Sequence, residues 1–311
     1  MTGIMKVHAI IDFMHIYYKY YFQLKAGKLK RLSAPLDWNG TVIEKDTTLI
    51  YYPLRDIENI RKGLEANQHE VTVSICFDTP SIRKETEGGD EYKSNRTKTL
   101  NDDDFENIEC IREALKKAGY NTYRYEGYEA DDIINQLCRE FRNNFEYTII
   151  YTNDKDLLVN ITNNVCVMRF KQYTGYTQVG MSNYEQYLEQ EFGVFIPYNM
   201  IGLYLATVGD SADKIKGIVK FGKKAFSKLI TKVMTTCEVD MKKCGDYYEL
   251  AKVVEECSKY LTDVQYEQLK ISFALVANME ILDDIKQPVK EDTDDKRREA
   301  YETFKFNSLM Q

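Results

Sequence analysis

Nine carboxylates stand after apolar runs or in short polar turns of this 311-residue chain. They are Asp12, Asp78, Glu129, Asp131, Asp132, Asp154, Asp156, Asp210 and Asp213. Like charges that share a pocket raise one another's pKa, so a cluster of this size needs cations to stay ionised. Because oxygen-only ligands suit hard divalent ions, the acids predict a site for magnesium or manganese.

Three short apolar runs would bring these acids together. Residues 7–11, 71–77 and 147–152 are rich in β-branched and aromatic side chains, as strands buried on both faces are. Each run stops at or just before an acid. In an open parallel sheet the ligand crevice lies at the carboxyl ends of the strands, so we expect the acids to meet there. Residues 164–170 predict a fourth strand.

A helix predicted over residues 128–143 carries three acids in its first turn, where the helix dipole favours negative charge. Glu129 and Asp132 share one face of this helix, and Asp131 is offset by one residue. Taken alone, this turn is explained by helix stability.

Two further pairs of acids also have structural explanations when each is taken singly. Asp154 and Asp156 follow a strand and would either bind a metal or form an Asx turn. Asp210 and Asp213 fit a loop and a helix cap. All three groups occur in the same chain as the strand-end acids, and in an order that would bring them to one edge of the sheet. This favours one shared metal site over three unrelated structural roles.

A polar segment over residues 79–99 has almost no apolar side chains, so we expect it to lie outside the core. Its cations would lie beside the acids and could clamp a phosphoryl group. An aromatic such as Tyr92 could stack on a base. The basic residues that carry this hypothesis are Arg83, Lys84, Lys93 and Arg96.

Gly217 and Gly222 bracket a short apolar turn, and a lysine-rich helix follows it. Such a turn lets backbone N–H groups approach phosphates closely, with the helix N-terminus assisting. A solvated basic helix is the alternative, but the acids just upstream favour phosphate binding. The lysines expected to bind DNA are Lys220, Lys223, Lys224 and Lys228.

The other elements of the first half follow from apolar periodicity. Residues 15–24, 47–66 and 103–118 have helical spacing, and residues 25–46 predict a long loop or a hairpin.

The chain becomes mostly helical from residue 182. Ser182 and Glu185 have the spacing of a capping box, and Pro197 would begin the next helix. The charged run over residues 290–302 predicts a solvated face or a fraying end.

The composition is that of an ordinary globular protein, 43% hydrophobic and 29% charged. The net charge of −7 hides a local basic stretch, which matters more for nucleic-acid binding than the sum. Seven cysteines without a CxxC pair predict buried free thiols in a reducing cytoplasm, and three histidines make a zinc site improbable. No apolar stretch is long enough for a membrane span, and the first residues resemble a strand rather than a secretory signal.

In their order along the chain, these residues resemble the motifs of the 5′-nuclease family. That family includes flap endonucleases, the 5′-nuclease domains of bacterial DNA polymerases, and bacteriophage 5′–3′ exonucleases and RNase H. The resemblance covers about residues 7–232 and none of its departures, such as Phe13 where glycine is common, removes a carboxylate. The motifs are Asp12 at a strand end, FD at 77–78 with Arg83 and YKxxR at 92–96, ExDD at 129–132, TxDxDLL at 152–158, GDxxD at 209–213 and the turn at 217–222.

The resemblance implies an α/β fold with a PIN-like three-layer nuclease core and a central, mostly parallel sheet over residues 1–180. An arch or gateway segment would span about 79–100. A helical region would follow over 181–311, with a helix–three-turn–helix for DNA binding at about 200–232.

It also implies a structure-specific 5′–3′ exonuclease or flap endonuclease that cleaves near 5′ ends of branched, nicked or RNA-primed DNA, in replication and primer removal. Two Mg²⁺ ions would act, with Mn²⁺ as a substitute, and K⁺ would sit in the helix–three-turn–helix. Lys93 and Arg96 would contact the scissile phosphate. The metal ligands would be Asp12, Asp78, Glu129, Asp131 and Asp132 directly, and Asp154, Asp156, Asp210 and Asp213 at the second ion or in its outer shell.

The partners that the resemblance implies are DNA with a 5′ flap or end, an RNA–DNA hybrid, and single-strand-binding or replication proteins. The location would be the cytoplasm, that of the host if the chain is of bacteriophage origin. Two alternatives stay open: a nuclease of the same fold acting on structured RNA, and a non-catalytic DNA-binding scaffold whose acids are structural.

Overall fold

The structure is a computed structural model of the whole chain. The residues it describes are 4–38, 41–94, 99–171, 175–197, 199–236, 247–277, 279–281, 284–303 and 305–310.

A six-stranded sheet in the order β5-β4-β1-β6-β7-β8 forms the centre of the molecule, and every neighbouring pair is parallel except β7 with β8. The four strands predicted from apolar runs are confirmed. The strands are β1 Lys6–Asp12, β4 Glu70–Cys76, β5 Asn121–Tyr123, β6 Tyr147–Tyr151, β7 Val165–Lys171 and β8 Gly175–Val179.

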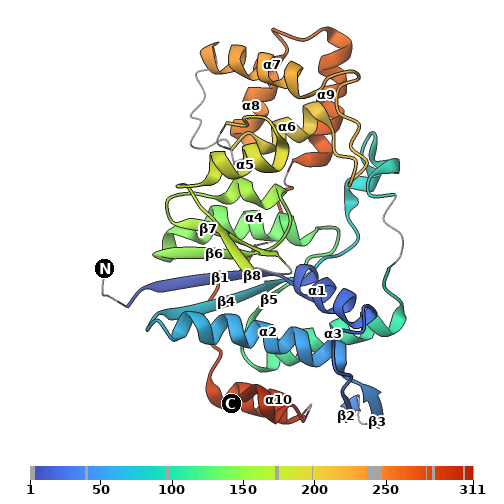
Figure 1. Cartoon of the computed structure of the whole chain (residues 1–311), viewed down its shortest axis with the longest axis vertical. Helices are drawn as coiled ribbons and strands as arrows, with labels where there is room; N and C mark the ends of the chain where they lie inside the picture. Colours follow the sequence, from blue (N-terminus) through green and yellow to red (C-terminus); the bar gives the residue numbers. More distant parts are fainter. Residues whose placement is uncertain are drawn as a thin grey trace.

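Helices cover both faces of this sheet, as Figure 1 shows. Successive residues of a strand point to opposite faces. Accordingly Ala9 and Ile11 of β1 pack with α1 Phe13–Lys25, α2 Thr48–Glu65 and α3 Asp102–Lys117, while Ile10 packs with α4 Ala130–Phe141. The three-layer α/β architecture is therefore confirmed.

The segment over residues 25–46, predicted as a loop or a hairpin, contains a hairpin. Strands β2 Ser33–Trp38 and β3 Thr41–Asp46 pair antiparallel and project from the molecule beside α3 (Figure 1).

Helices α5 to α9 lie beyond α4, at the end of the molecule opposite α10 (Figure 1). One apolar cluster runs continuously from Ile10 and Ile134 to Leu188 and Phe226, so the helical region packs directly on the core. The helices are α5 Tyr184–Phe192, α6 Ile201–Val208, α7 Lys223–Thr236, α8 Tyr247–Cys257 and α9 Asp263–Val276.

Two predicted helix starts are wrong. The N-cap of α5 is Asn183, without a side-chain cap, rather than Ser182 in a capping box. The α6 helix begins at Ile201 and not at Pro197.

The charged run at the C-terminal end contains a packed helix with a solvated face, so the predicted fraying end is wrong and the predicted solvated face is confirmed. After α9 the chain passes along edge strand β5, where Asn121 and Val289 exchange two hydrogen bonds of 2.8 and 3.0 Å. Helix α10 Asp294–Thr303 then packs against α3. Tyr301 is fully buried and donates to Glu58, which anchors the helix. Such a cover also protects the sheet edge from pairing with another chain.

In the part of the chain that the structure describes, the cysteines are buried free thiols as predicted: Cys76, Cys110, Cys138, Cys166 and Cys257. Cys237 and Cys244 lie outside the described residues. Among the described helices, none has the length and apolarity to cross a membrane.

Candidate metal centre

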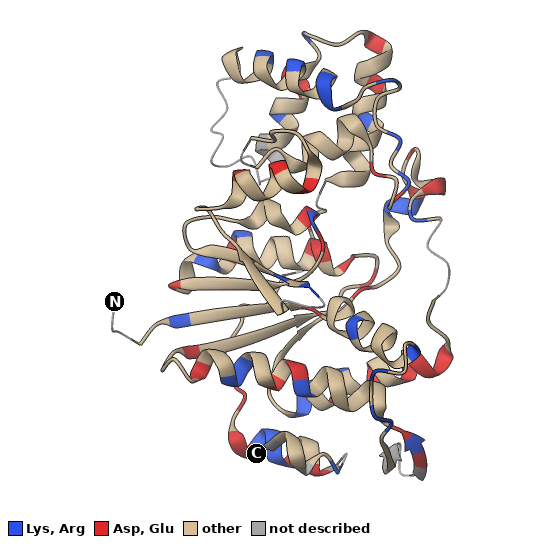
Figure 2. Cartoon of the chain, in the orientation of Figure 1, with Lys and Arg blue, Asp and Glu red and all other residues tan. Residues whose placement is uncertain are grey.

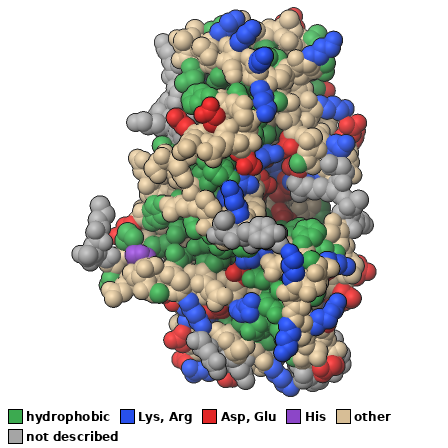
Figure 3. All heavy atoms as spheres, viewed as in Figure 1, with side chains coloured by type: hydrophobic (Ala, Val, Ile, Leu, Met, Phe, Trp, Pro, Cys, Tyr) green, Lys and Arg blue, Asp and Glu red, His purple; other side chains and the backbone are tan. Residues whose placement is uncertain are grey.

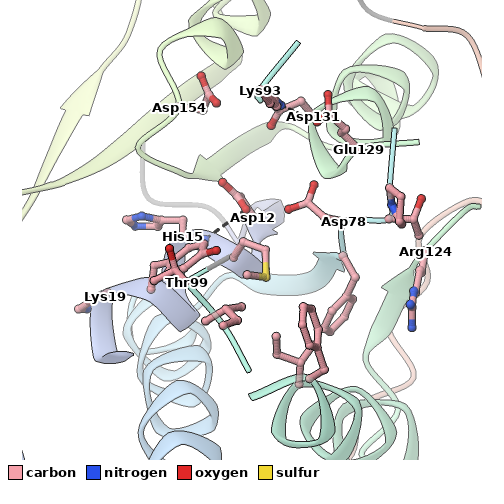
Figure 4. Close-up of a pocket in the computed structure, with 18 of the residues that line it drawn as sticks. Asp12, His15, Lys19, Asp78, Lys93, Thr99, Arg124, Glu129, Asp131 and Asp154 are labelled. Atoms are coloured by element: carbon pink, nitrogen blue, oxygen red, sulfur yellow. Dashed lines mark hydrogen bonds and ion pairs between the residues drawn. The ribbon is translucent and has the colours of Figure 1, made fainter. Parts of the chain in front are cut away.

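A cleft of about 1130 Å³ opens at the carboxyl ends of the strands, and five of the nine acids line it together with Lys93. In Figure 4 the carboxylates of Asp12, Asp78 and Asp131 point toward one shared space. In Figure 3 acidic side chains occupy a hollow near the middle of the visible face, with basic side chains around it. The five acids are Asp12, Asp78, Glu129, Asp131 and Asp154.

Asp12 is held by both of its oxygens. It ends β1 and caps α1, so Oδ1 accepts from His15 N at 3.3 Å, while Oδ2 accepts from the Thr152 hydroxyl at 2.8 Å. Burial, followed by the charge of Asp78, raises the pKa of Asp12 to about 7. The side chain is therefore oriented toward the cleft but poorly neutralised.

Asp78 connects β4 to the helix that carries the next acids. Its Oδ1 accepts from the backbone N–H of Ala130 at 2.7 Å, one of the N–H groups that a helix N-terminus leaves unpaired. This contact places Asp131, one residue later, beside the strand-end acids. Burial and the charges of Asp154 and Asp12 raise the pKa of Asp131 well above its ordinary value.

Asp132 does not join this cluster, contrary to what the sequence predicted. It is fully buried, and both of its oxygens are occupied. Arg83 donates to Oδ2 at 2.9 Å and to Oδ1 at 2.5 Å, and the backbone N–H groups of Glu129 and Met279 add bonds of 3.1 and 2.8 Å. One residue of helical offset thus turns Asp131 into the cleft and Asp132 into a structural ion pair.

Glu129 faces cations instead of other acids. Lys93 donates to its Oε1 at 2.5 Å, and Arg83 and the Tyr92 hydroxyl donate to Oε2 at 3.0 and 2.9 Å. Although burial opposes ionisation, Lys93 and Arg83 hold the pKa of Glu129 below its ordinary value. Burial also disfavours a charged lysine, but Glu129 raises the pKa of Lys93 well above its ordinary value, so the ammonium is retained.

A second group of acids adjoins the cleft. Carboxylate oxygens of Asp156, Asp210 and Asp213 lie within 4.8 Å of one another. Oδ1 of Asp156 is buried without a hydrogen-bond partner among the described residues, and burial with the charge of Asp154 raises its pKa well above the ordinary value. An unsatisfied buried carboxylate oxygen within an all-oxygen group fits a hard divalent cation.

The polar segment after Asp78 is more buried than the sequence predicted. The Arg83 and Tyr92 side chains, expected to bind DNA, lie under the surface at 4% exposure each. Tyr92 packs with Ile215 and Leu275. Lys84 is exposed, and Arg96 lies outside the described residues.

The glycine turn between α6 and α7 is compact for a steric reason. Gly217 has φ +65°, and a Cβ there would lie 2.5 Å from the N atom of Gly209. Ile218 N donates to Thr207 O at 2.8 Å and closes the turn. A Cβ at Gly222 would meet nothing within 4 Å, so close packing does not explain that glycine.

The basic residues near this turn are open to solvent, and Figure 2 shows Lys and Arg along α7. The exposed lysines are Lys214, Lys216, Lys220, Lys223, Lys224, Lys228 and Lys232.

Sequence reasoning missed two polar residues of the site. Thr152 orients Asp12 and also accepts from Asp154 N at 2.9 Å. Lys155 lies 2.8 Å from Asp210 and neutralises part of the second acidic group. Both stand inside the TxDxDLL motif, so the signal was their position between the acids.

Comparisons with known proteins agree with this arrangement. Residues 7–193 match the family described as 5′-3′ exonuclease, N-terminal resolvase-like domain. A 5′-3′ exonuclease of Aquifex aeolicus is 30% identical over 230 residues, which cover 74% of this chain and 71% of that protein. A 5′-3′ exonuclease of Buchnera aphidicola is 31% identical over 189 residues, 61% of each protein, and a DNA polymerase I of Caldicellulosiruptor bescii is matched over only 21% of its length.

Solved structures share the fold. A bacteriophage T5 protein co-crystallised with metal ions covers 98% of this chain and 95% of its own, with a TM-score of 0.55 at 14% identity. A bacteriophage T5 flap endonuclease in complex with DNA and metal ions has a TM-score of 0.53 at 15% identity, covering 96% of this chain and 99% of its own.

Proposed function

The chain belongs to the 5′–3′ exonuclease family, and from this premise we propose that it is a structure-specific 5′-nuclease hydrolysing phosphodiesters near 5′ ends of branched, nicked or RNA-primed DNA. One observation carries the proposal. Acids from β1, the β4 end, α4 and the β6 end line one cleft beside a retained ammonium, that of Lys93.

The two acidic groups would each hold a divalent cation. One ion would be held by Asp12, Asp78, Asp131 and Asp154. The other would be held by Asp156, Asp210 and Asp213. Oxygen-only ligands favour Mg²⁺, with Mn²⁺ as a substitute. Bound in this way, the ions would lower the pKa of an attacking water and stabilise the leaving 3′ oxygen.

Lys93 would supply positive charge to the scissile phosphate. Its ammonium is held at the rim of the cleft by Glu129, and it keeps its proton because that carboxylate raises its pKa. A fixed cation beside a phosphate stabilises the charge that develops during cleavage. Arg96 would assist, a role that rests on the YKxxR motif alone.

The glycine turn and α7 would grip the duplex away from the cut. Gly217 lets the turn pack tightly against the end of α6. The exposed Lys223, Lys224 and Lys228, which follow the turn, would contact phosphates. Three further parts of the proposal rest on the family resemblance alone. They are a potassium ion bound by the turn, cleavage of RNA–DNA hybrids, and binding to single-strand-binding or replication proteins. So is the division into a nuclease core over 1–180 with an arch over 79–100 and a helical region over 181–311.

Cleavage of 5′-labelled flap, nicked and RNA-primed duplexes, with Mg²⁺ or with chelator, tests the function. We expect cuts near the 5′ end that require the ion, and weaker cleavage of matched all-RNA flaps. If no duplex is cut in Mg²⁺ or Mn²⁺ while DNA is still bound, the chain is a scaffold and the nuclease proposal fails.

A further inference from the structure

Arg83 is a buried cation that contacts three separate parts of the chain. One guanidinium nitrogen, Nη1, donates to Asp132 and to Glu129 at 2.9 and 3.0 Å. The other, Nη2, donates to Asp132 at 2.5 Å and to the backbone carbonyl of Ala277 at 2.9 Å. A planar fork of donors can serve these acceptors together, whereas a lysine ammonium is a single point charge.

The Ala277 contact belongs to a short segment that leaves α9 and whose described residues lie along α4, here called the strap (residues 277 and 279–281). Met279 N donates to Asp132 at 2.8 Å. One helical turn further along α4, Ile281 N donates to the Gln136 side chain at 2.8 Å. The strap is therefore fixed to the same helix face that holds Arg83.

On its other side Arg83 reaches the ion pair of Lys93. Glu129 uses Oε1 for Lys93 and Oε2 for Arg83 and the Tyr92 hydroxyl. Arg83 thus limits the orientations of the carboxylate, and the carboxylate fixes the ammonium. A connected series of bonds runs from Ala277 through Arg83 and Glu129 to Lys93.

Helix α9 supports the same loop at a second point. Gly88 has φ +78°, and a Cβ there would lie 2.7 Å from the Cγ2 of Ile271 on α9. Leu275, one turn later, packs on Tyr92. The C-terminal region, for which the sequence suggested no role, therefore contacts the loop before Lys93 from two directions.

We infer that Arg83 is a positioning residue, through which the strap and α4 hold Lys93 at the rim of the acidic cleft. The inference rests on the proposed function, because the action of Lys93 on a phosphate belongs to that function. Arg83 acts through Glu129 and does not touch DNA, since its side chain is 4% exposed and its acceptors are protein atoms.

A merely structural ion pair would also be damaged by mutation, so the test must separate positioning from stability. Arg83→Lys keeps the charge and loses the fork. The effect of Arg83→Lys on the single-turnover rate of flap DNA cleavage, measured at saturating enzyme, is compared in the wild-type and Lys93→Ala backgrounds. We expect Arg83→Lys to lower the cleavage rate about tenfold in the wild-type background. In the Lys93→Ala background it should have almost no effect, because the side chain that Arg83 positions is already absent. The change in melting temperature should be the same in both.

A control on the same strap is available. Arg139 and Glu280 form an exposed pair at 3.2 Å, with side chains 29% and 50% exposed. Arg139→Ala should leave the cleavage rate unchanged, because it breaks a strap contact without touching Asp132. Affinity for DNA and its salt dependence should stay at wild-type values in both single variants.

Amide hydrogen exchange over residues 82–94 gives a readout that needs no cleavage. It should be faster in Arg83→Lys and unchanged in Arg139→Ala. If the wild type cuts nothing in Mg²⁺, the proposed function fails, and exchange still decides the role of Arg83. Equal rate losses in both backgrounds, unchanged exchange, or weaker DNA binding with a lower salt slope would each overturn the positioning role.

Discussion

The backbone N–H of Lys93 donates to the carbonyl oxygen of Asp213 at 3.0 Å, so the loop after Asp78 is bonded to the turn that precedes α7. The Lys93 ammonium also lies 3.8 Å from the Asp213 carboxylate. Lys93, which we propose acts on the scissile phosphate, is therefore held close to both acidic groups. It is also bonded to the segment that leads into the proposed duplex-binding turn. This contact would therefore set the distance along DNA between the cleaved phosphodiester and the duplex phosphates bound by the turn and α7.

Lys93→Ala should lower the single-turnover rate by about 10²-fold or more, the scale for losing one charge contact to the transition state. Binding of flap DNA should change little, because the lysines of the turn remain. Quench-flow kinetics at saturating enzyme measure the rate. Lys116→Ala, which removes an exposed lysine of α3 paired with Glu113, is the control and should keep the wild-type rate. A Lys93→Ala rate within twofold of wild type would refute the assignment.

Asp131→Asn and Asp132→Asn should have opposite phenotypes although the residues are neighbours. Asp131→Asn removes a charge from a repulsive group, so cleavage and metal binding should be lost without a loss of stability. Asp132→Asn leaves the buried Arg83 poorly paired and should cost about 3 kcal/mol of unfolding free energy. Chelator-treated protein unfolded in urea, and isothermal titration with Mn²⁺, measure the two effects. A similar stability loss in both variants would contradict the different roles.

Stability of the metal-free protein should fall as pH rises from about 4 to 7. The pKa of Asp12 is raised from 3.8 to about 7, so over this interval the folded state binds more protons than the unfolded state. Asp12 alone should contribute at most about 1.4 kcal/mol per pH unit to this slope, and Asp131 and Asp156, whose pKa values are also raised, add to it. Urea unfolding in chelator measures the slope, and Asp12→Asn should reduce it by the share that Asp12 contributes. Binding of Mn²⁺ at pH 6 should release protons, which titrations in buffers of different ionisation enthalpy detect.

Lys223→Ala with Lys224→Ala should reduce the slope of log affinity against log salt by about 0.9 for each phosphate that the protein no longer neutralises. Fluorescence anisotropy of labelled duplex between low and moderate salt measures this. Lys296→Ala, on α10 at the other end of the molecule, should leave the slope unchanged. An unchanged slope in the double variant would show that these two lysines of α7 do not contact DNA phosphates.

Gly217→Ala should destabilise the turn by about 2 kcal/mol or more, because the new Cβ meets the backbone and φ is positive. Gly222→Ala meets open space and should keep the melting temperature near that of the wild type. Thermal unfolding of the two variants side by side makes the comparison. Equal melting temperatures would show that the turn relaxes more easily than its contacts imply.

Much of the fold followed from local pattern. Apolar runs ending in acids predicted the parallel strands, and the carboxyl-end rule placed Asp12 and Asp78 at one edge of the sheet. Helical periodicity predicted α2 and α3 to within one or two residues, because an amphipathic face is recorded in every turn of a helix.

Other features depended on partners far away in the chain. Spacing along α4 shows that Asp131 and Asp132 point in different directions, but only the positions of Arg83 and Met279 decide which one enters the cleft. The burial of α10 likewise depends on Glu58, 243 residues before Tyr301. The sequence by itself determined that carboxylates and basic side chains would meet at the carboxyl ends of the parallel strands. Tertiary structure decided which of them face each other, because a local sequence pattern sets a side chain's direction relative to its own element and carries no record of what packs opposite.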